Sequence, residues 1–329
     1  MNFRRKLSPH SIRRFKDFTL PVAIVVGIAL WDPLWHLEFV IPYMIGGMLF
    51  FTFLKLSPRG IRFLPVHWLL AAIQLGLGIA SFFLIRHIGG GSALSNLSAE
   101  GSMICFIAPA ATASAVIISM MGGNLGTGAA YVLLTNTGIA LVAPLLFSLL
   151  GESATLSLWQ SVWLIFRGIA PLVFGPLLLA WIIRFGAPAL HHRLSSIPQV
   201  AFWLWVISLA IILAHTVKFI VDRECPIDQL LLLSACGLVT CTIQFALGKW
   251  IGAKSRGADA ITIGQSLGQK NTTLAIWITQ MYLNPISSIA PASYIIWQNS
   301  FNSLQLWLKT RRDERAAEKM IPKRQDEKA

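Results

Sequence analysis

Charged residues are scarce in this sequence. Only 12% of the 329 residues are charged, whereas a soluble chain carries about 25%. All 14 acidic residues fall in tails, connections or the ends of apolar segments, so no carboxylate is expected at the middle of a membrane. The net charge of +13 would indicate a nucleic-acid partner in a soluble protein. Because the basic residues cluster at segment ends, we expect no such partner here.

Cysteine and enzyme motifs are also lacking. The four cysteines are Cys105, Cys225, Cys236 and Cys241, and no Cys-x-x-Cys or Cys/His metal spacing is present, so the sequence predicts neither a disulfide nor a metal site. There is no hydrolase triad, phosphate-binding glycine loop or dinucleotide fingerprint. We therefore expect a protein that is not an enzyme and that has no cofactor.

Long apolar runs are what the sequence does contain. Hydrophobic residues make up 55% of it, and runs of roughly 18 or more recur, which indicates an all-α polytopic membrane protein. Ten transmembrane helices are predicted, at residues 18–35, 40–54, 66–85, 103–121, 126–150, 158–185, 200–221, 230–251, 260–283 and 286–308.

Lysine and arginine are distributed unevenly between the two ends of these spans. Twenty-two of the 27 lie in the two tails and the even-numbered connections, and only Arg86, Lys218 and Arg223 lie on the other side. The positive-inside rule then places both termini in the cytoplasm of a cell inner or plasma membrane protein, beside anionic lipid headgroups. The remaining two, Arg167 and Lys270, fall within spans.

Ten spans divide into two sets of five. An odd number of spans per half makes the second half enter the membrane inverted, as in many secondary transporters. The expected organisation is a basic segment at 1–17, a transporter domain at 18–308 with repeats at 18–150 and 158–308, and a charged tail at 309–329. The fourth span of each half is interrupted by Gly, Pro and polar residues, at 108–124 and 263–275, which predicts a midplane binding site.

The pieces around these interruptions resemble the bile acid:sodium symporter family and its wider superfamily of organic-anion carriers. The matching residues are Thr112-Ala113-Ser114, Gly123-Asn124, Pro144, Gly248-Lys249-Trp250, Gly268, Asn271, Leu274, Ala275 and Trp297-Gln298-Asn299. The resemblance implies a panel domain and a core domain, with two crossed, broken helices in the core at spans four and nine.

The departures from that family concern its sodium ligands. Gln74 and Ser114 match the ion-binding glutamine and serine, but Ser266 stands where the family has a glutamate. Lys270 stands where it has a glutamine, and Ala115 where it has an asparagine. Most of the oxygen ligands that a hard cation needs are therefore missing.

We hypothesise that Lys270 replaces a sodium ion. Helix C-terminal carbonyls favour a positive charge, and an ammonium with three donors can satisfy them. Lys270 could be a fixed charge, could exchange protons during transport, could bind the substrate directly, or could lie at an interface. Other candidate site residues are polar groups in the interrupted spans and in span ten: Ser266, Gln269, Asn271, Thr112, Ser114, Gln74 and Asn299.

The expected function is secondary transport of a small organic anion by alternating access, without the family's sodium sites. The alternative is a sodium-coupled symporter of bile acids or organic acids with rearranged sites. A lysine-linked chromophore protein is a further alternative, although it would need a carboxylate counter-ion that the spans lack. A membrane sensor is the last, although no soluble sensor domain is apparent.

Overall fold

The fold is taken from a computed structural model, which describes residues 19, 21–55, 61–111, 113–150, 157–197, 199–222, 226–256 and 259–320. The predicted basic segment at 1–17, Thr112, Cys225 and the last nine residues of the tail lie outside the described residues.

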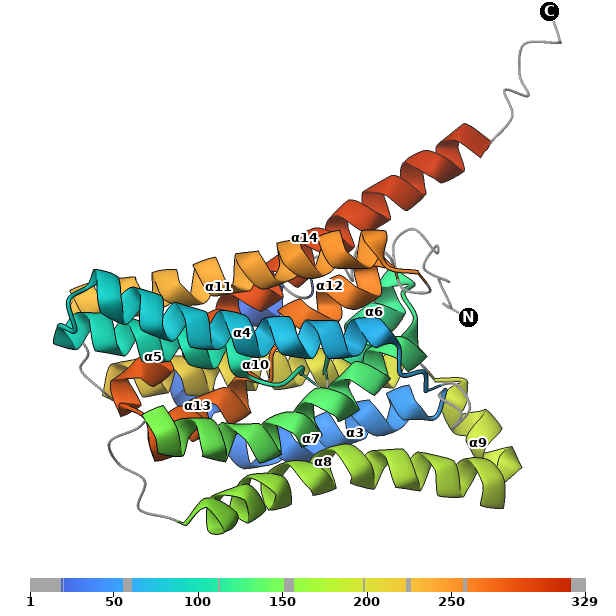
Figure 1. The fold of residues 1–329 in the computed structure, drawn as a ribbon. Coiled ribbons are helices and arrows are strands. Elements are labelled where there is room, and N and C mark those ends of the chain that lie inside the picture. The colour runs from blue at the N-terminus through green and yellow to red at the C-terminus, as the bar shows by residue number, and fades with distance from the viewer. Residues whose placement is uncertain are drawn as a thin grey trace, which may run out of the picture.

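The described chain is a bundle of helices without a β-strand (Figure 1). Residues 21–29 are helical. The elements that follow are α2 (Trp31–Trp35), η1 (Glu38–Val40), α3 (Ile41–Phe53), α4 (Pro65–Ile88), α5 (Ala93–Ile107), α6 (Ala113–Met121), α7 (Leu125–Leu150), α8 (Leu158–Gly186), α9 (Pro188–Ser195), α10 (Gln199–Asp222), α11 (Ile227–Lys254), α12 (Ala260–Gly268), α13 (Thr272–Tyr282), η3 (Pro285–Ser288) and α14 (Ile289–Met320).

The predicted spans coincide with helices over most of their lengths, with two large differences in boundaries. The tenth was predicted to end at residue 308, but α14 continues to Met320. The fourth was predicted to begin at residue 103, but α5 begins at Ala93, where Ser92 accepts a hydrogen bond from the Ser95 backbone N–H as an N-cap. The polar residues of 95–102 had the composition of a connection. They are helical because α5 packs between α4 and α11, where a helix satisfies its own backbone groups.

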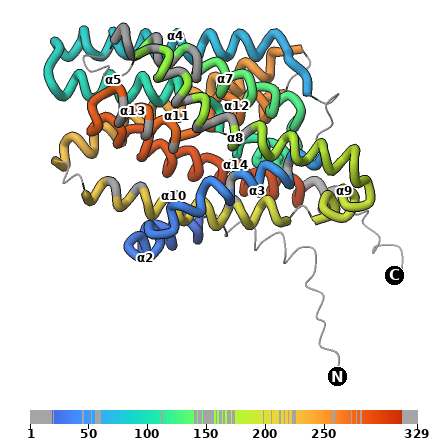
Figure 2. The backbone as a smooth tube through the Cα atoms, turned by 90° about the horizontal axis from the view of Figure 1, so that it is seen from below, coloured from blue at the N-terminus to red at the C-terminus, as the bar shows by residue number. Residues whose placement is uncertain are grey.

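The helices form two packed groups. In one, α4 packs on α5, and α11 packs on α5, α12 and α14. In the other, α3 packs on α8 and α10, and α10 packs on α2. Figure 2 shows α4 and α5 on one side of the molecule and α2 and α10 on the other. Contacts of α3 with α6, α7 with α8 and α10 with α14 join the two groups.

Within the part of the chain that the structure describes, three helices are long and apolar enough to cross a membrane, namely α4, α10 and α11. The outward faces of α4, α8 and α11 carry large apolar side chains, and contiguous exposed apolar surface of this kind marks contact with lipid or a partner. The exposed residues include Trp68, Leu69, Phe83, Leu84, Trp159, Trp163, Ile182, Phe185, Leu231, Val239 and Trp250. The fold is compatible with an all-α membrane protein.

Candidate functional site

Two interrupted helices meet in the centre of the first packed group. α5 ends at Ile107 and α6 begins at Ala113, while α12 ends at Gly268 and α13 begins at Thr272. Between these ends, Ala110 and Lys270 form an isolated antiparallel bridge. The two interruptions predicted from the sequence therefore lie side by side.

Two backbone hydrogen bonds hold the interruptions together. The Ala111 N–H donates to the Gln269 carbonyl at 2.8 Å, and the Asn271 N–H donates to the Pro109 carbonyl at 2.8 Å. Pro109 has no N–H and disfavours a helical conformation at the residue before it, which explains the end of α5. The Asn271 side chain accepts from the Leu274 N–H at 3.2 Å, so it caps α13.

Side chains from neighbouring helices satisfy the carbonyls at the two broken C-terminal ends. Gln74 on α4 donates to the Ile107 carbonyl at 2.9 Å, and Gln244 on α11 donates to the Cys105 carbonyl at 3.1 Å. The Tyr294 hydroxyl on α14 donates to the Gly268 carbonyl at 2.8 Å. Unpaired carbonyls at a helix end are costly when buried, so these three side chains stabilise the interruptions.

Lys270 is at the centre of this arrangement and is 1% exposed. Its Nζ donates to the Gln74 side-chain oxygen at 2.8 Å, and the same oxygen accepts from the Tyr131 hydroxyl at 3.1 Å. The ammonium was expected to satisfy backbone carbonyls. Instead, the side chains of Gln74, Gln244 and Tyr294 donate to those carbonyls. Lys270 in turn donates to the side-chain oxygen of Gln74.

The backbone of each interruption is also held by side chains of the second α-helix after it, α7 in one case and α14 in the other. On α7, the Thr135 hydroxyl accepts from the Ala110 N–H at 3.1 Å, and Asn136 donates to the Ala110 carbonyl at 3.0 Å. On α14, the Gln298 side-chain oxygen accepts from the Lys270 N–H at 2.9 Å, and its amide donates to the Lys270 carbonyl at 3.4 Å. The N–H and carbonyl groups of Ala110 and of Lys270 are thus held in the same way, by side chains of α7 and of α14.

The sequence contains a signal for some of the side chains that bind the backbone of the interruptions. Residues 131–136 read Tyr-Val-Leu-Leu-Thr-Asn and residues 294–299 read Tyr-Ile-Ile-Trp-Gln-Asn, so tyrosine, a polar residue and asparagine recur at the same spacing. Tyr131, Gln244 and Tyr294 were not among the predicted site residues. Single polar groups in apolar helices are common. The repeated spacing distinguishes Tyr131 and Tyr294, whereas no sequence signal marks Gln244.

The predicted site residues have different environments. Gln74, Gln269, Lys270 and Asn271 take part in the hydrogen bonds above, whereas Asn299 donates to the Ile295 carbonyl of its own helix at 2.7 Å. Ser114 and Ser266 are both 0% exposed, and their hydroxyls make no hydrogen bond within the described residues. Thr112 is outside the described residues.

Further buried polar side chains lie on α12 and α14. Gln265 donates to the Gln305 side-chain oxygen at 3.3 Å. Asn302, one helical turn from both Gln298 and Gln305, is 0% exposed, and neither polar atom of its side chain has a partner in the described chain. Asn302 was not predicted as a site residue. Its burial depends on the packing of α14 and could not be read from the sequence.

Comparisons of the chain with protein-family models and with characterised proteins gave no match.

Proposed function

We propose that this protein is a secondary transporter that moves a small organic anion across a membrane by alternating access. In this proposal, Lys270 takes the place of a bound sodium ion, so that transport does not require sodium. The chain would be a divergent relative of the bile acid:sodium symporter family, as its motifs suggest.

The environment of Lys270 is the main support. A fully buried lysine at the meeting point of two broken helices is costly, and such residues inside membrane segments usually have a role in transport. Lys270 occupies the position of the family's ion-binding glutamine, and its Nζ binds Gln74, the residue that matches a second sodium ligand. An ammonium at this place can make the contact that a cation would make.

The repeated contacts support an inverted-repeat architecture. If the chain has ten spans in two halves, α7 is the fifth span of the first half and α14 is the fifth span of the second. Each of them binds the backbone of the preceding interruption through residues at the same spacing. The two backbone hydrogen bonds between the interruptions are also mutually reciprocal. Both features fit two halves of opposite orientation whose broken helices bind the substrate between them.

The two packed groups of helices support a rocking motion. The group of α2, α3, α8 and α10 corresponds to a panel, and the group that contains the interruptions corresponds to a core. We expect substrate access to alternate as one group rotates against the other, with most helix contacts inside each group retained.

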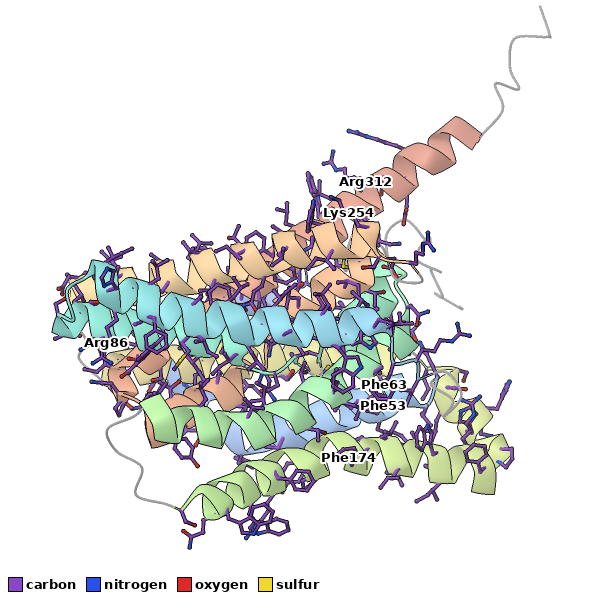
Figure 3. All side chains as sticks on the ribbon, in the orientation of Figure 1. Phe53, Phe63, Arg86, Phe174, Lys254 and Arg312 are labelled. Atoms are coloured by element: carbon purple, nitrogen blue, oxygen red, sulfur yellow. The ribbon has the colours of Figure 1, made fainter. Side chains whose placement is uncertain are left out.

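The charge distribution supports the proposed orientation. Figure 3 shows Arg86 at one end of the helices, and Lys254 and Arg312 toward the other. Trp250 and Trp307 contact Lys254 and Arg311 at 4.1 and 4.7 Å from the ring centroids to the charged groups. Basic and aromatic side chains of this kind fit the cytoplasmic membrane interface.

Ser114 and Ser266 favour the second candidate, a sodium-coupled symporter. Their buried hydroxyls have no partner among the described residues, and hydroxyl oxygens are suitable ligands for a hard cation. The two candidates differ in one measurable property, the dependence on sodium.

A thermal-shift screen of the purified protein tests this function. The probes are taurocholate, benzoate, lactate and succinate, each as potassium and as sodium salts. We expect at least one anion to raise the apparent Tm equally in both salts, and that anion to enter proteoliposomes without a sodium gradient. Uptake that requires sodium would establish the second candidate, and no binding or uptake of any anion would contradict the transport function.

Restoring the family residues should create sodium dependence. The double variant Ser266→Glu and Lys270→Gln supplies a carboxylate and an amide oxygen in place of the amine. We expect sodium, but not potassium, to raise its Tm by a few °C, since a ligand at about 100 times its Kd stabilises by about 2.7 kcal/mol. The wild-type protein is the control, and a sodium-dependent rise in the wild type would contradict the replacement of sodium by Lys270.

A further inference from the structure

The hydrogen bonds of Lys270 provide few acceptors for a charged ammonium. Within the described residues, the only acceptor that Nζ reaches is the Gln74 oxygen, which the Tyr131 hydroxyl shares. An ammonium has three N–H donors and no acceptor, whereas a neutral amine has two N–H donors and a lone pair. The neutral amine therefore leaves fewer buried donors unpaired.

The surroundings of Lys270 also provide no negative charge. None of the ion pairs in the described chain includes Lys270. The titratable groups that face it are thiols and phenols: Cys105 on α5 and Cys241 on α11 interact with it, Tyr131 on α7 shares its acceptor, and Tyr294 on α14 binds the preceding Gly268. These groups are neutral at neutral pH when buried, so no side chain that faces Lys270 in the described part of the chain carries a negative charge to offset an ammonium.

The carboxylates of Glu100 and Asp259, on the interrupted helices, accept hydrogen bonds from groups other than Lys270. Glu100 on α5 accepts from the Asn284 N–H at 2.9 Å and from the Ser287 hydroxyl at 2.8 Å. Asp259 caps α12 and accepts from the Thr262 N–H at 2.7 Å and from its hydroxyl at 2.6 Å. Among the described residues, none therefore supplies a counter-charge for Lys270.

We propose that the transported anion supplies this counter-charge, and that Lys270 couples its transport to protons. This inference rests on the transport function proposed above. Lys270 is a neutral amine while the site is closed without substrate. It takes one proton from water as a monoanion binds, giving an ammonium and anion pair with no net charge change. The proton and the anion leave together on the other side.

The coupling is reciprocal by thermodynamic necessity. If the anion favours the ammonium, protonation of Lys270 must favour anion binding by the same factor. Neither the isolated ammonium nor the isolated anion is stable in the closed site, because an unpaired buried charge is costly. The protein would therefore act as a symporter of one proton with each monoanion.

The pH dependence of stability tests the neutral amine without any substrate. The unfolded chain carries a charged Lys270 below about pH 10 and so binds more protons than the folded protein, which means that folding stability rises with pH. We expect the apparent Tm of the wild type, relative to Lys270→Met, to rise by about 2 °C or more per unit between pH 6 and 9. A constant difference would overturn the proposal.

Two further variants keep this test decisive. Gln74→Glu places a carboxylate at the acceptor of Nζ and should keep Lys270 protonated, so the Tm of this variant should not rise with pH. This comparison remains available even if Lys270→Met does not fold. Lys254→Met removes an exposed lysine on α11, and its Tm should follow the wild type at every pH.

Proton uptake tests the coupling itself. Each anion that raises the Tm in the screen of taurocholate, benzoate, lactate and succinate is added to weakly buffered protein at pH 7. About one proton should be taken up per monoanion bound, and Lys270→Arg, which is always charged, should take up none. Anion binding without proton uptake would overturn the coupling but leave the transport function intact, whereas an absence of anion binding would contradict the transport function first.

Discussion

At the residue scale, Gln74 has more roles than any other side chain at the site. Its amide group donates to the Ile107 carbonyl, and its oxygen accepts from Lys270 and Tyr131. It therefore connects α4 to both interruptions and to α7. The sequence singled it out only by its match to a sodium ligand, whereas its role here depends on contacts with α5, α7 and the segment between α12 and α13.

Replacing Gln74 should destabilise the protein strongly. Gln74→Leu leaves the Ile107 carbonyl, the Tyr131 hydroxyl and the Lys270 amine without partners, and each unsatisfied buried group costs about 1–3 kcal/mol. We expect a fall of more than about 5 °C in the apparent Tm, together with loss of anion uptake.

Tyr131→Phe is the matched control for this variant. It removes only the hydroxyl that donates to Gln74, and a single hydrogen bond contributes about 0.5–1.5 kcal/mol. Its Tm should therefore fall by much less. Equal losses in the two variants would show that Gln74 does not hold Lys270 in the manner described.

At the element scale, α11 and α12 approach so closely that glycine is needed. A Cβ at Gly248 would lie 2.8 Å from the Ile263 carbonyl oxygen and 2.9 Å from the Gly264 Cα. Because these are backbone atoms, they cannot move aside without moving α12. This contact determines how α12 brings Lys270 to Gln74.

Gly248→Ala should therefore displace α12. Overpacking of this kind costs about 1–3 kcal/mol, which should lower the Tm by several °C and reduce anion affinity. Gly76→Ala on α4 is the control, because a Cβ there meets nothing within 4 Å. It should be neutral or stabilising by up to about 1 kcal/mol. If Gly248→Ala behaves like Gly76→Ala in heat-inactivation assays, the close packing does not position Lys270.

Backbone-to-side-chain hydrogen bonds also join the interrupted helices beyond the ends of α6 and α13. The Asn124 N–H donates to the Thr262 hydroxyl at 2.7 Å, and the Asn284 N–H donates to the Glu100 carboxylate at 2.9 Å. The first bond joins the turn after α6 to the beginning of α12, and the second joins the turn after α13 to the middle of α5. These hydrogen bonds hold the two interrupted helices to each other.

At the scale of the whole molecule, membrane orientation is the property most open to direct measurement. The positive-inside bias predicts that both termini are cytoplasmic. A green fluorescent protein fused after Ala329 should fluoresce in a bacterial host, and alkaline phosphatase fused after Gly91, in the turn that follows α4, should be active. Reversal of both readouts would contradict the orientation, whereas placement of both fusion points on the same side of the membrane would contradict the predicted number of spans between them.

The sequence by itself determined the helical, membrane-compatible character of the protein and the positions of both interruptions. These follow from local properties: apolar run length, the missing N–H of Pro109, and glycine and polar residues inside apolar segments. The beginning of α5 was misplaced by ten residues, because a polar segment such as 95–102 becomes helical only when neighbouring helices cover it.

Only the tertiary structure decided what Lys270 contacts. Its acceptor, Gln74, is 196 residues away in the chain, and the carbonyls that it was expected to satisfy are capped by Gln74, Gln244 and Tyr294. Hydrogen bonds between distant helices depend on how the helices pack, which local sequence patterns do not specify. The sequence identified the unusual lysine, and the packing shows that it is buried without a counter-charge among the residues that the structure describes.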